Sequence, residues 1–401
     1  MFILCWLLSP NVRRAIDLCR QVRRLAAAQR DLLPPGALEE LGAAAAELRS
    51  LCVARADKKV IETGMVELEK AANRLLQPHP APRWRENVEV LLVTGAVVLA
   101  IRTFFLQPMA IPTGSAQPSL WGITHENLRN RAEAKLPTGL DRIAQSWWSG
   151  IHYYHIVAKR AGELTRIDLP RLVLPFVKRQ TFWVGGESYT LWFPPDDLAG
   201  RAGLYPGQRF QAGEDILKLR VVSGDHLFVN RMAYNFRKPR RGDIIVFSST
   251  DIDRHLRVYH GLPVLTPDTH YIKRLVALGD DRVQIGDDRH LVINGERLDA
   301  ATPGFENVYS FDPREPPRLD HFSGHVNDRI ALEVLRRSIA PLFPDSKQEF
   351  RVRPHHLLAL GDNTLNSHDG RAWGDFPEEK VVAKASFVFW PITGRFGWGY
   401  R

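Results

Sequence analysis

The sequence predicts a mostly β domain of antiparallel sheets, preceded by an N-terminal helical region and one transmembrane helix. Three observations carry this prediction. Apolar residues recur at helical spacing before residue 77, one apolar run covers 88–106, and short strand-like runs with Gly-Asp and Asn-Gly turns fill the chain after residue 120. The 401 residues, 44% hydrophobic and 25% charged, suffice for one to three folded domains.

The net charge of +9 allows an anionic membrane surface or a nucleic acid as partner. No block of lysine and arginine with interleaved aromatic residues stands out, so we expect no nucleic-acid partner. The three cysteines, Cys5, Cys19 and Cys52, all precede the apolar run. This distribution argues against a disulfide framework and fits an N-terminal part in a reducing compartment.

Residues 1–76 are expected to form a helical region on the cytoplasmic side. Apolar residues recur there at alternating three and four spacing, and Pro34-Pro35-Gly36 separates the first helix from the rest. One stripe per helix indicates a helical hairpin or short coiled coil, with recruitment of a partner as the alternative. Residues 77–87, which begin QPHPAP, are expected to form a proline-rich linker.

The apolar run is expected to be a transmembrane helix over 88–106. Its uninterrupted core, Val90 to Ile101, is short enough for a buried helix instead. It spans a bilayer if Arg102 extends its charged head toward one interface. Arg83 and Arg85 at its start favour a cytoplasmic N-terminal side.

Residues 107–401 are expected to form the β-rich domain on the other side of the membrane, with an insert at about 122–220. Within the insert we expect short helices over 127–135 and 140–148, and a hairpin around Gly185-Gly186. The aromatic stretch 147–157 fits a membrane interface or a small core, and we favour the core. Strand-like runs follow in DHLFVNRM, GDIIVFSS, YIKRLVAL, DRVQI, HLVING, HLLALGD and ASFVFW.

Ser115 is the candidate nucleophile, in the stretch IPTGSAQPSL that follows the apolar run. Pro112 and Pro118 limit the backbone on both sides, and Gly114 lets another group approach closely. A serine in a Gly/Pro turn is also an ordinary turn residue. No GxSxG motif is present, so an α/β-hydrolase elbow is not supported.

A lysine is the candidate base. The scattered histidines suggest no triad, and the absence of HExxH or zinc-spaced Cys/His clusters disfavours a metal, so we expect no cofactor. In YIKRLVAL, strand alternation puts Lys273 on one face and Arg274 on the other, and the pattern alone does not choose between them. An amine among apolar neighbours has a lowered pKa, because its charged form loses hydration.

A third candidate segment is GDNTLNSHDGRAWGDFPEE, residues 361–379. Polar residues this dense after the apolar strand HLLAL suggest a hydrogen-bond network, with a solvated loop as the alternative. Asp369 and Arg371 could form a charge-assisted pair there, and Ser367 could orient a lysine amine.

Together these segments resemble bacterial type I signal peptidases, the membrane-bound Ser-Lys proteases that remove secretory signal peptides. RTFFLQPMAIPTGSAQPSL, GDHLFVNRMAYNFRKPRRGDIIVF, YIKRLVALGDDRV and GDNTLNSHDGRAWG are similar to four blocks of that family, in the same order. They cover roughly a quarter of the chain and leave the N-terminal helices and the insert unexplained. Ala116 stands where the family usually has methionine, which removes bulk from a pocket wall.

The resemblance implies roles for the candidate residues. Ser115 would be the nucleophile and Lys273 the neutral base, and the Ser115 backbone N–H and the Thr113 hydroxyl would form the oxyanion hole. Ser367 would hydrogen-bond the lysine. The remaining residues would brace the site or line its shallow pockets for small side chains: Asp369 and Arg371, and Ile111, Leu120, Tyr271 and Ile272.

The resemblance also implies a location and partners. The chain would be a single-pass protein of the bacterial inner membrane, with its peptidase domain on the extracytoplasmic side and the signal peptides of secreted preproteins as substrates. The lipid bilayer would be its other partner. Two alternatives remain: a soluble self-cleaving repressor-like Ser-Lys peptidase, and a non-catalytic membrane scaffold with the same fold.

Overall fold

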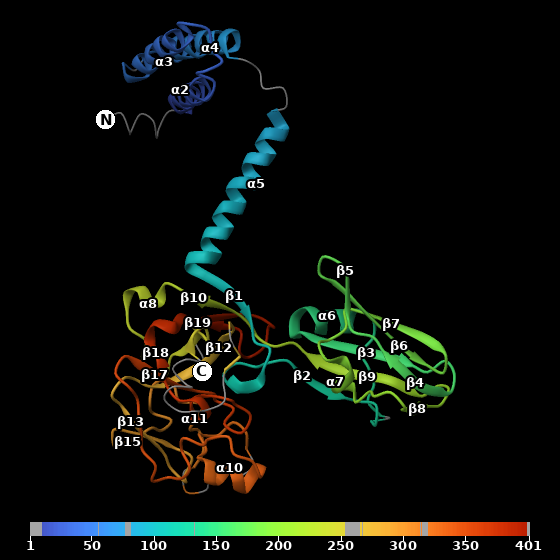
Figure 1. Ribbon diagram of the computed structural model, residues 1–401. Coiled ribbons are helices and arrows are strands. Elements are labelled where there is room, and N and C mark those ends of the chain that lie inside the picture. Colours follow the sequence, from blue (N-terminus) through green and yellow to red (C-terminus); the bar gives the residue numbers. More distant parts are fainter. Residues whose placement is uncertain are drawn as a thin grey trace. The chain divides into compact units, whose positions relative to one another are not determined.

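The computed structural model describes residues 10–398, except 55, 77–81, 132, 253–264, 267, 313 and 315–319. The chain divides into two compact units, Met1–Val97 and Val98–Arg401 (Figure 1).

Three helices form the core of the first unit: α2 (Pro10–Ala28), α3 (Ala37–Val53) and α4 (Lys58–Leu75). Their apolar stripes meet in one buried cluster, which includes Val22, Leu48 and Leu68. Gly36 precedes α3 in a left-handed conformation, with a φ of 82° that glycine adopts without steric cost. The expected packing of the stripes on one another is confirmed.

The apolar run forms helix α5 (Pro82–Ala100), followed by one π-helical turn, η1 (Ile101–Phe105). Residues 82–87 are therefore helical rather than part of a linker, because Pro82 stands at the first helical position, where its missing N–H is not needed. The expected linker residues 77–81 lie outside the described residues. Among those described, Glu86–Phe105 is long and apolar enough to cross a membrane. Leu106, expected in the helix, is the first residue of strand β1.

The largest sheet has the order β1-β10-β19-β11-β12-β17-β18, with β20 paired to β19, and its described pairings are antiparallel. Its strands are β1 (Leu106–Ala110), β10 (His226–Asn230), β11 (Ile244–Ser248), β12 (His270–Ala277), β17 (His356–Leu360), β18 (Phe376–Pro377), β19 (Val381–Trp390) and β20 (Gly397–Trp398). Strand β1 lies at the edge of this sheet.

A second sheet, β15-β14-β13-β16, packs its apolar residues in a core with those of β12 and β17. It consists of β13 (Arg282–Ile285), β14 (Leu291–Ile293), β15 (Glu296–Arg297) and β16 (Phe350–Arg351). All seven strand-like runs of the sequence therefore form strands. Short helices complete the region: η2 (Gly114–Ala116), α8 (Ala233–Phe236), α10 (Asp328–Leu335), α11 (Gly370–Trp373) and η3 (Glu378–Lys380).

The expected insert is a β lobe that begins with strand β2 and ends with strand β9 (Figure 1). We call residues 124–222 the inserted lobe. One sheet has the order β2-β9-β3, and the other β5-β6-β4-β8 with β7 paired to β6. The elements are β2 (Thr124–Asn127), α6 (Gly139–Ser149), β3 (Ile151–Val157), β4 (Gly162–Ile167), β5 (Arg171–Leu174), β6 (Val177–Val184), β7 (Glu187–Trp192), α7 (Leu198–Ala202), β8 (Arg209–Phe210) and β9 (Asp215–Val222).

The inserted lobe has a hydrophobic core of its own, around Leu164, Phe182 and Leu219. The hairpin at Gly185-Gly186 is confirmed, since Val184 pairs with Glu187. The helix expected over 127–135 is wrong. Asn127 ends strand β2 opposite Leu219, so pairing with β9 overrides the local helical preference there.

Candidate active site

Ser115 lies in the short helix η2, five residues after edge strand β1 ends. Its backbone is held by Asn363, whose N–H donates to the Ser115 carbonyl oxygen at 3.1 Å and whose amide Nδ2 donates to that of Gly114 at 2.9 Å. Gly361 passes so close that a Cβ there would lie 2.5 Å from the Ser115 oxygen. The segment 361–363 thus fixes where the serine hydroxyl points.

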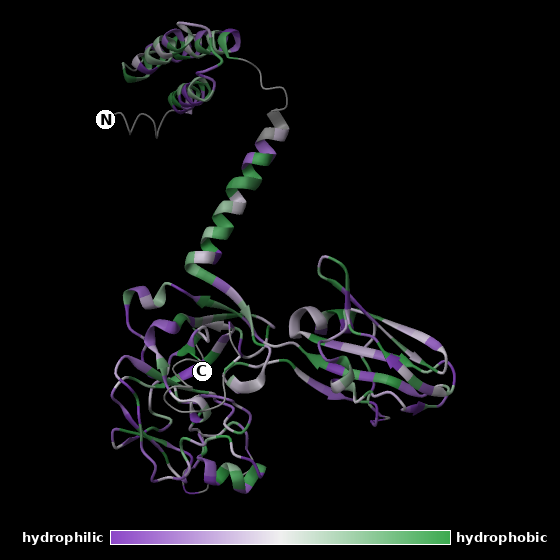
Figure 2. Cartoon of the chain, in the orientation of Figure 1, coloured by the Kyte–Doolittle hydropathy of each residue, from purple (hydrophilic) through white to green (hydrophobic). Residues whose placement is uncertain are grey.

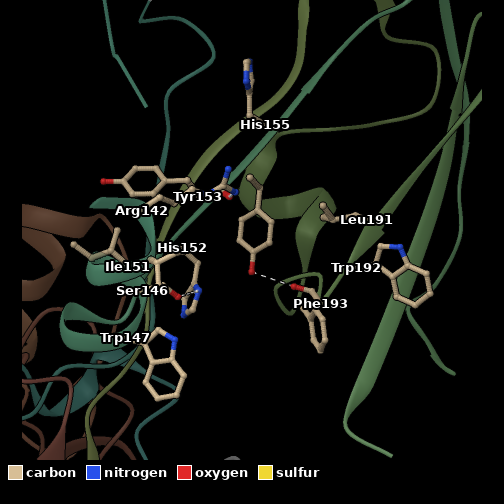
Figure 3. Close-up of a pocket in the computed structure, with 12 residues that line it drawn as sticks. Arg142, Ser146, Trp147, Ile151, His152, Tyr153, His155, Leu191, Trp192 and Phe193 are labelled. Atoms are coloured by element: carbon tan, nitrogen blue, oxygen red, sulfur yellow. Dashed lines mark hydrogen bonds between the residues drawn. The ribbon is translucent and has the colours of Figure 1, made fainter. Parts of the chain in front are cut away.

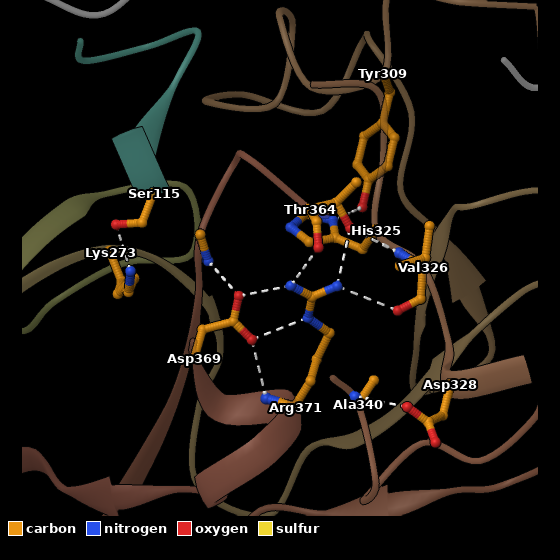
Figure 4. A network of polar contacts seen from close by, with 11 residues as sticks. Ser115, Lys273, Tyr309, His325, Val326, Asp328, Ala340, Thr364, Asp369 and Arg371 are labelled. Atoms are coloured by element: carbon orange, nitrogen blue, oxygen red, sulfur yellow. Dashed lines mark hydrogen bonds and ion pairs between the residues drawn. The ribbon is translucent and has the colours of Figure 1, made fainter. Parts of the chain in front are cut away.

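Lys273, in strand β12, faces this hydroxyl. Its Nζ donates to Ser115 Oγ at 2.6 Å, and Figure 4 shows the amine pointing at the serine. The lysine is only 3% exposed. Burial lowers the pKa of Lys273 from 10.5 to about 8, although the nearby Asp369 carboxylate favours the charged form. A substantial fraction of such an amine is neutral near pH 8, so it can accept a proton from the serine.

Arg274, the next residue, points to the other side of β12. Its guanidinium makes a bidentate pair with Asp362, with Nη2 and Oδ2 2.6 Å apart, and also donates to Ser119 Oγ at 2.8 Å. Ser119 in turn donates to Asp362 at 2.6 Å. The geometry therefore decides the choice that strand alternation left open: the lysine meets Ser115, and the arginine is neutralised by a carboxylate.

Asp369 and Arg371 form a fully buried ion pair beside the lysine (Figure 4). Asp369 accepts from the Arg371 Nε and Nη2, each at 2.9 Å, and from the Gly361 N–H. Although burial raises the pKa of Asp369, the arginine outweighs it and holds the value at about 2. Thr364 and the Val326 carbonyl accept further hydrogen bonds from the Arg371 guanidinium. The pair locks segment 361–371, and with it the backbone beneath Ser115.

Ser367 is buried close to Gly361, and its Oγ has no hydrogen-bond partner among the described residues. The expected bond to Lys273 is therefore not formed in this structure. Ser367 instead lines a cavity of about 440 Å³ together with His368. Thr113 is exposed, and its hydroxyl lies 3.5 Å from Ser115 Oγ.

The four expected pocket residues divide between two hydrophobic clusters. Ile111, Leu120 and Ile272 share one cluster with Ala116. Tyr271 packs in the other, and its hydroxyl accepts from the Thr266 N–H. Leu120 is fully buried, so it contributes to the packing beneath η2 rather than to an open surface.

Sequence reasoning missed three residues that organise the site: Ser119, Asp362 and Asn363. Asp362 and Asn363 follow the apolar strand HLLAL after the single residue Gly361, and Ser119 follows Pro118 within the serine segment. Their position at the end of a buried strand and inside a rigid loop could have marked them. Among the described residues, no group of three or more His, Cys, Asp and Glu residues could hold a metal ion.

A serine hydroxyl hydrogen-bonded to a buried amine is an arrangement in which the amine, rather than a histidine, could take the serine proton. Residues 217–390 match the family model described as "Signal peptidase, peptidase S26". Residues 217–390 are therefore similar to signal peptidases, a similarity that covers less than half of the chain.

Individual proteins with similar sequences are also described as signal peptidases. A signal peptidase I of Leptolyngbya laminosa is 28% identical over 187 residues, which is 46% of this chain and 69% of that protein. One from Pseudomonas fluorescens is 28% identical over 45% of this chain and 65% of that protein. A probable signal peptidase I-2 of Synechocystis is 28% identical over 42% and 56%, respectively. The similarity thus spans between 56% and 69% of these relatives' lengths.

Among solved structures, a crystal structure of a signal peptidase I from Enterococcus faecalis V583 aligns at 23% identity with a TM-score of 0.22. The alignment covers 37% of this chain and 97% of that one.

Proposed function

We propose that this chain is a membrane-bound endopeptidase that removes N-terminal signal peptides from exported preproteins with a Ser-Lys dyad. The observation that carries the proposal is the 2.6 Å contact between Lys273 Nζ and Ser115 Oγ, made by an amine that burial shifts toward its neutral form. The similarity of residues 217–390 to signal peptidases supports the substrate class.

Acyl transfer follows from this geometry. Neutral Lys273 removes the proton from Ser115 as Oγ attacks the scissile carbonyl carbon and forms the ester bond. The peptide C–N bond then breaks, and Lys273 passes the proton to the leaving amine. A water molecule, deprotonated by the same lysine, hydrolyses the ester and returns the proton to Ser115.

Thr113 and the Ser115 backbone N–H would donate to the oxyanion. The Thr113 hydroxyl is close to the nucleophile, at 3.5 Å from Ser115 Oγ, and it is exposed to an incoming substrate. Asp369 and Arg371 would act at a distance from the reacting atoms, by keeping segment 361–371 in place under the serine.

The edges of strands β1 and β12 favour a substrate that binds in an extended conformation. Strand β1 pairs only with β10 among the described strands, so its other edge can hydrogen-bond a peptide. Strand β17 pairs with β12 only from Arg274 onward, so no described strand pairs with His270–Lys273 on that side. A signal peptide lying along these edges would add a strand and bring its scissile bond to Ser115.

The candidate span Glu86–Phe105 would anchor the chain in the inner membrane as a single pass, because its apolar side chains are exposed over a length that suits a bilayer. Arg83 and Arg85 favour an N-terminal side in the cytoplasm and an extracytoplasmic peptidase domain. The same helix argues against a soluble self-cleaving peptidase, and the close Ser115–Lys273 contact argues against a scaffold without activity.

Cleavage of a preprotein with an Ala-X-Ala signal sequence tests the proposal. Ser115→Ala and Lys273→Met should each lower the rate by at least about a thousandfold, because either change removes a group that takes part directly in the reaction. Lys218→Met is the matched control, since Lys218 is also a buried lysine in a strand but lies in the inserted lobe. Near wild-type cleavage by folded Lys273→Met enzyme would exclude the dyad.

A further inference from the structure

The hairpin of strands β5 and β6 ends in an exposed apolar tip. Leu172 is 67% exposed, Leu174 62% and Phe176 94%. Phe176 adopts a φ of 70°, a left-handed conformation that is costly for an aromatic residue. The chain therefore holds an aromatic ring in water at a turn position where glycine or asparagine would be easier, and Figure 2 shows the apolar colour concentrated at this tip.

Basic residues flank the tip. Arg171 lies directly opposite Arg179 across the two strands, and neither forms an ion pair with a described residue. The nearby Asp168 interacts with Arg171 electrostatically but is paired with Arg166. Like charges in directly opposed positions destabilise a strand pair. Arg179 also lies over the ring of Trp192, 6.0 Å from its centroid, on the neighbouring strand β7. An anion between the two arginines would relieve their repulsion.

Helix α6 presents a second unpartnered apolar face in the same lobe. Leu140, Ile143 and Trp147 recur at helical spacing and are all exposed, and Leu140 is 84% exposed. The helix is held in place by its backbone: the Trp147 carbonyl accepts from the Trp390 indole at 2.6 Å, and that of Trp148 from the Ile392 N–H at 2.7 Å. Its apolar face is thus fixed outward rather than left loose.

A cavity of about 400 Å³ joins the two features (Figure 3). Trp147 of α6 lines one side, and Trp192 and Phe193 line the other, all three substantially exposed. The apolar surface therefore continues from α6 across the cavity to the base of the hairpin. In Figure 1 the hairpin tip and α6 both lie at the end of their unit where strand β1 begins.

We propose that the inserted lobe docks on the surface of an anionic lipid bilayer, with the β5–β6 tip inserted to the level of the acyl chains. The tip rises about three residues beyond the Arg171–Arg179 pair, or about 10 Å at the strand spacing of about 3.3 Å. Interfacial segments enter the bilayer to about 5–10 Å, so the arginines come to the level of the phosphates. Trp147 and Trp192 occupy the level where tryptophan is enriched at membranes.

The charge and the aromatic rim favour lipid over a second copy of the chain. A second copy would bring another Arg171–Arg179 pair against the first and add to the repulsion. Phosphates of anionic lipids neutralise it, at about 1 kcal/mol or about fivefold in binding for each basic residue near the surface. The inference does not depend on the catalytic proposal, because no residue of the site contributes to this surface.

Depth-dependent fluorescence quenching tests the docking. In full-length protein with Cys5, Cys19 and Cys52 replaced by alanine, Val173→Cys in the tip carries an environment-sensitive dye, and the protein is reconstituted into phosphatidylglycerol–phosphatidylcholine vesicles with spin-labelled lipid. Ser188→Cys, exposed at the far end of the β6–β7 hairpin, is the matched control, and Val93→Cys in α5 reports on the membrane span.

We expect quenching at 173 and at 93 but not at 188. Changing both Arg171 and Arg179 to glutamine should lower the ratio of docked to undocked tip by about 25-fold. An unquenched tip with a quenched α5 would overturn the docking while leaving the membrane span intact. Equal quenching at residue 173 in pure phosphatidylcholine vesicles would overturn the role of anionic lipid. Energy transfer between labelled copies in detergent that rises with protein concentration would instead assign this face to self-association. Because none of these readouts uses cleavage, they fail independently of the proposed function.

Discussion

The sheet region around Ser115, formed by strands β1, β10–β12 and β17–β20, and the inserted lobe depart from ordinary folding rules in opposite ways. Around Ser115, strands β12 and β17 and the loop after β17 bury charged groups, among them Lys273, Asp362 and Arg371. The inserted lobe buries an ordinary apolar core and instead exposes leucine, phenylalanine and tryptophan. Buried charges cost free energy unless they are paired, and exposed apolar surface is unfavourable in water. Both departures lie where we propose chemistry or binding, which is where such costs are expected.

The buried ion pair offers the largest expected effect. Asp369→Asn leaves the Arg371 guanidinium buried without its carboxylate, so the free energy of unfolding should fall by about 3–5 kcal/mol. Asp168→Asn is the control, because Asp168 pairs with Arg166 on the surface of the inserted lobe, where loss of the carboxylate should change stability little. Chemical denaturation of the two variants measures both values, and equal losses would contradict the comparison.

Removing the ring of Phe182 tests whether the inserted lobe is supported by its own core. Phe182→Ala deletes a fully buried aromatic side chain and should cost about 3–5 kcal/mol. The loss of hydrogen-exchange protection should be confined to residues 124–222, and cleavage by Ser115 should persist. Matching loss of protection in strands β12 and β17 would show that the two regions unfold together.

The pKa of Lys273 predicts how activity depends on pH. Protonation removes the base, so kcat/KM should rise with pH and level off above about 8. The unfolded chain keeps the proton up to about 10.5, so between these values it binds more protons than the folded chain and raising the pH favours folding. Relative to Lys273→Met, wild type should therefore gain roughly 3 kcal/mol of stability between pH 8 and 10.5. A flat difference across that range would mean that the amine is hydrated.

Gly361→Ala should give the smallest effect that is still specific to the site. The new Cβ would lie 2.1 Å from Ser367 Oγ and 2.5 Å from the Ser115 carbonyl oxygen, so the serine segment must shift. Because displacements near 1 Å at reacting groups cost about a hundredfold, kcat should fall by about that factor. Gly394→Ala, which has open space around its Cβ, is the control and should leave kcat unchanged.

Local pattern was enough to predict the strands around Ser115, because each is a short apolar run bounded by turn residues. It failed at 127–135, where pairing of Asn127 with Leu219 depends on a strand ninety residues away. The resemblance was enough to name Ser115 and Lys273. Strand alternation alone left Lys273 and Arg274 open, and the physical reason for the choice, the contact of Arg274 with Asp362, is made only in the fold. The small core favoured for 147–157 is not what the start of that stretch forms, since Trp147 and Trp148 on α6 are exposed. An amphipathic pattern shows that an apolar face exists but not what covers it.

The adjacency of Lys273 and Arg274 has a consequence for how the strand must assemble. Lys273 pairs with Ile245 of β11, and Arg274 with Ile244. A shift of the β11–β12 register by one residue would move each side chain to the opposite face of the sheet. The misaligned enzyme would present Ser115 with a guanidinium that never gives up its proton, while an amine would face Asp362. Such a chain would be well folded elsewhere and still inert in the proposed reaction, so correct strand alignment during assembly is a condition for that reaction.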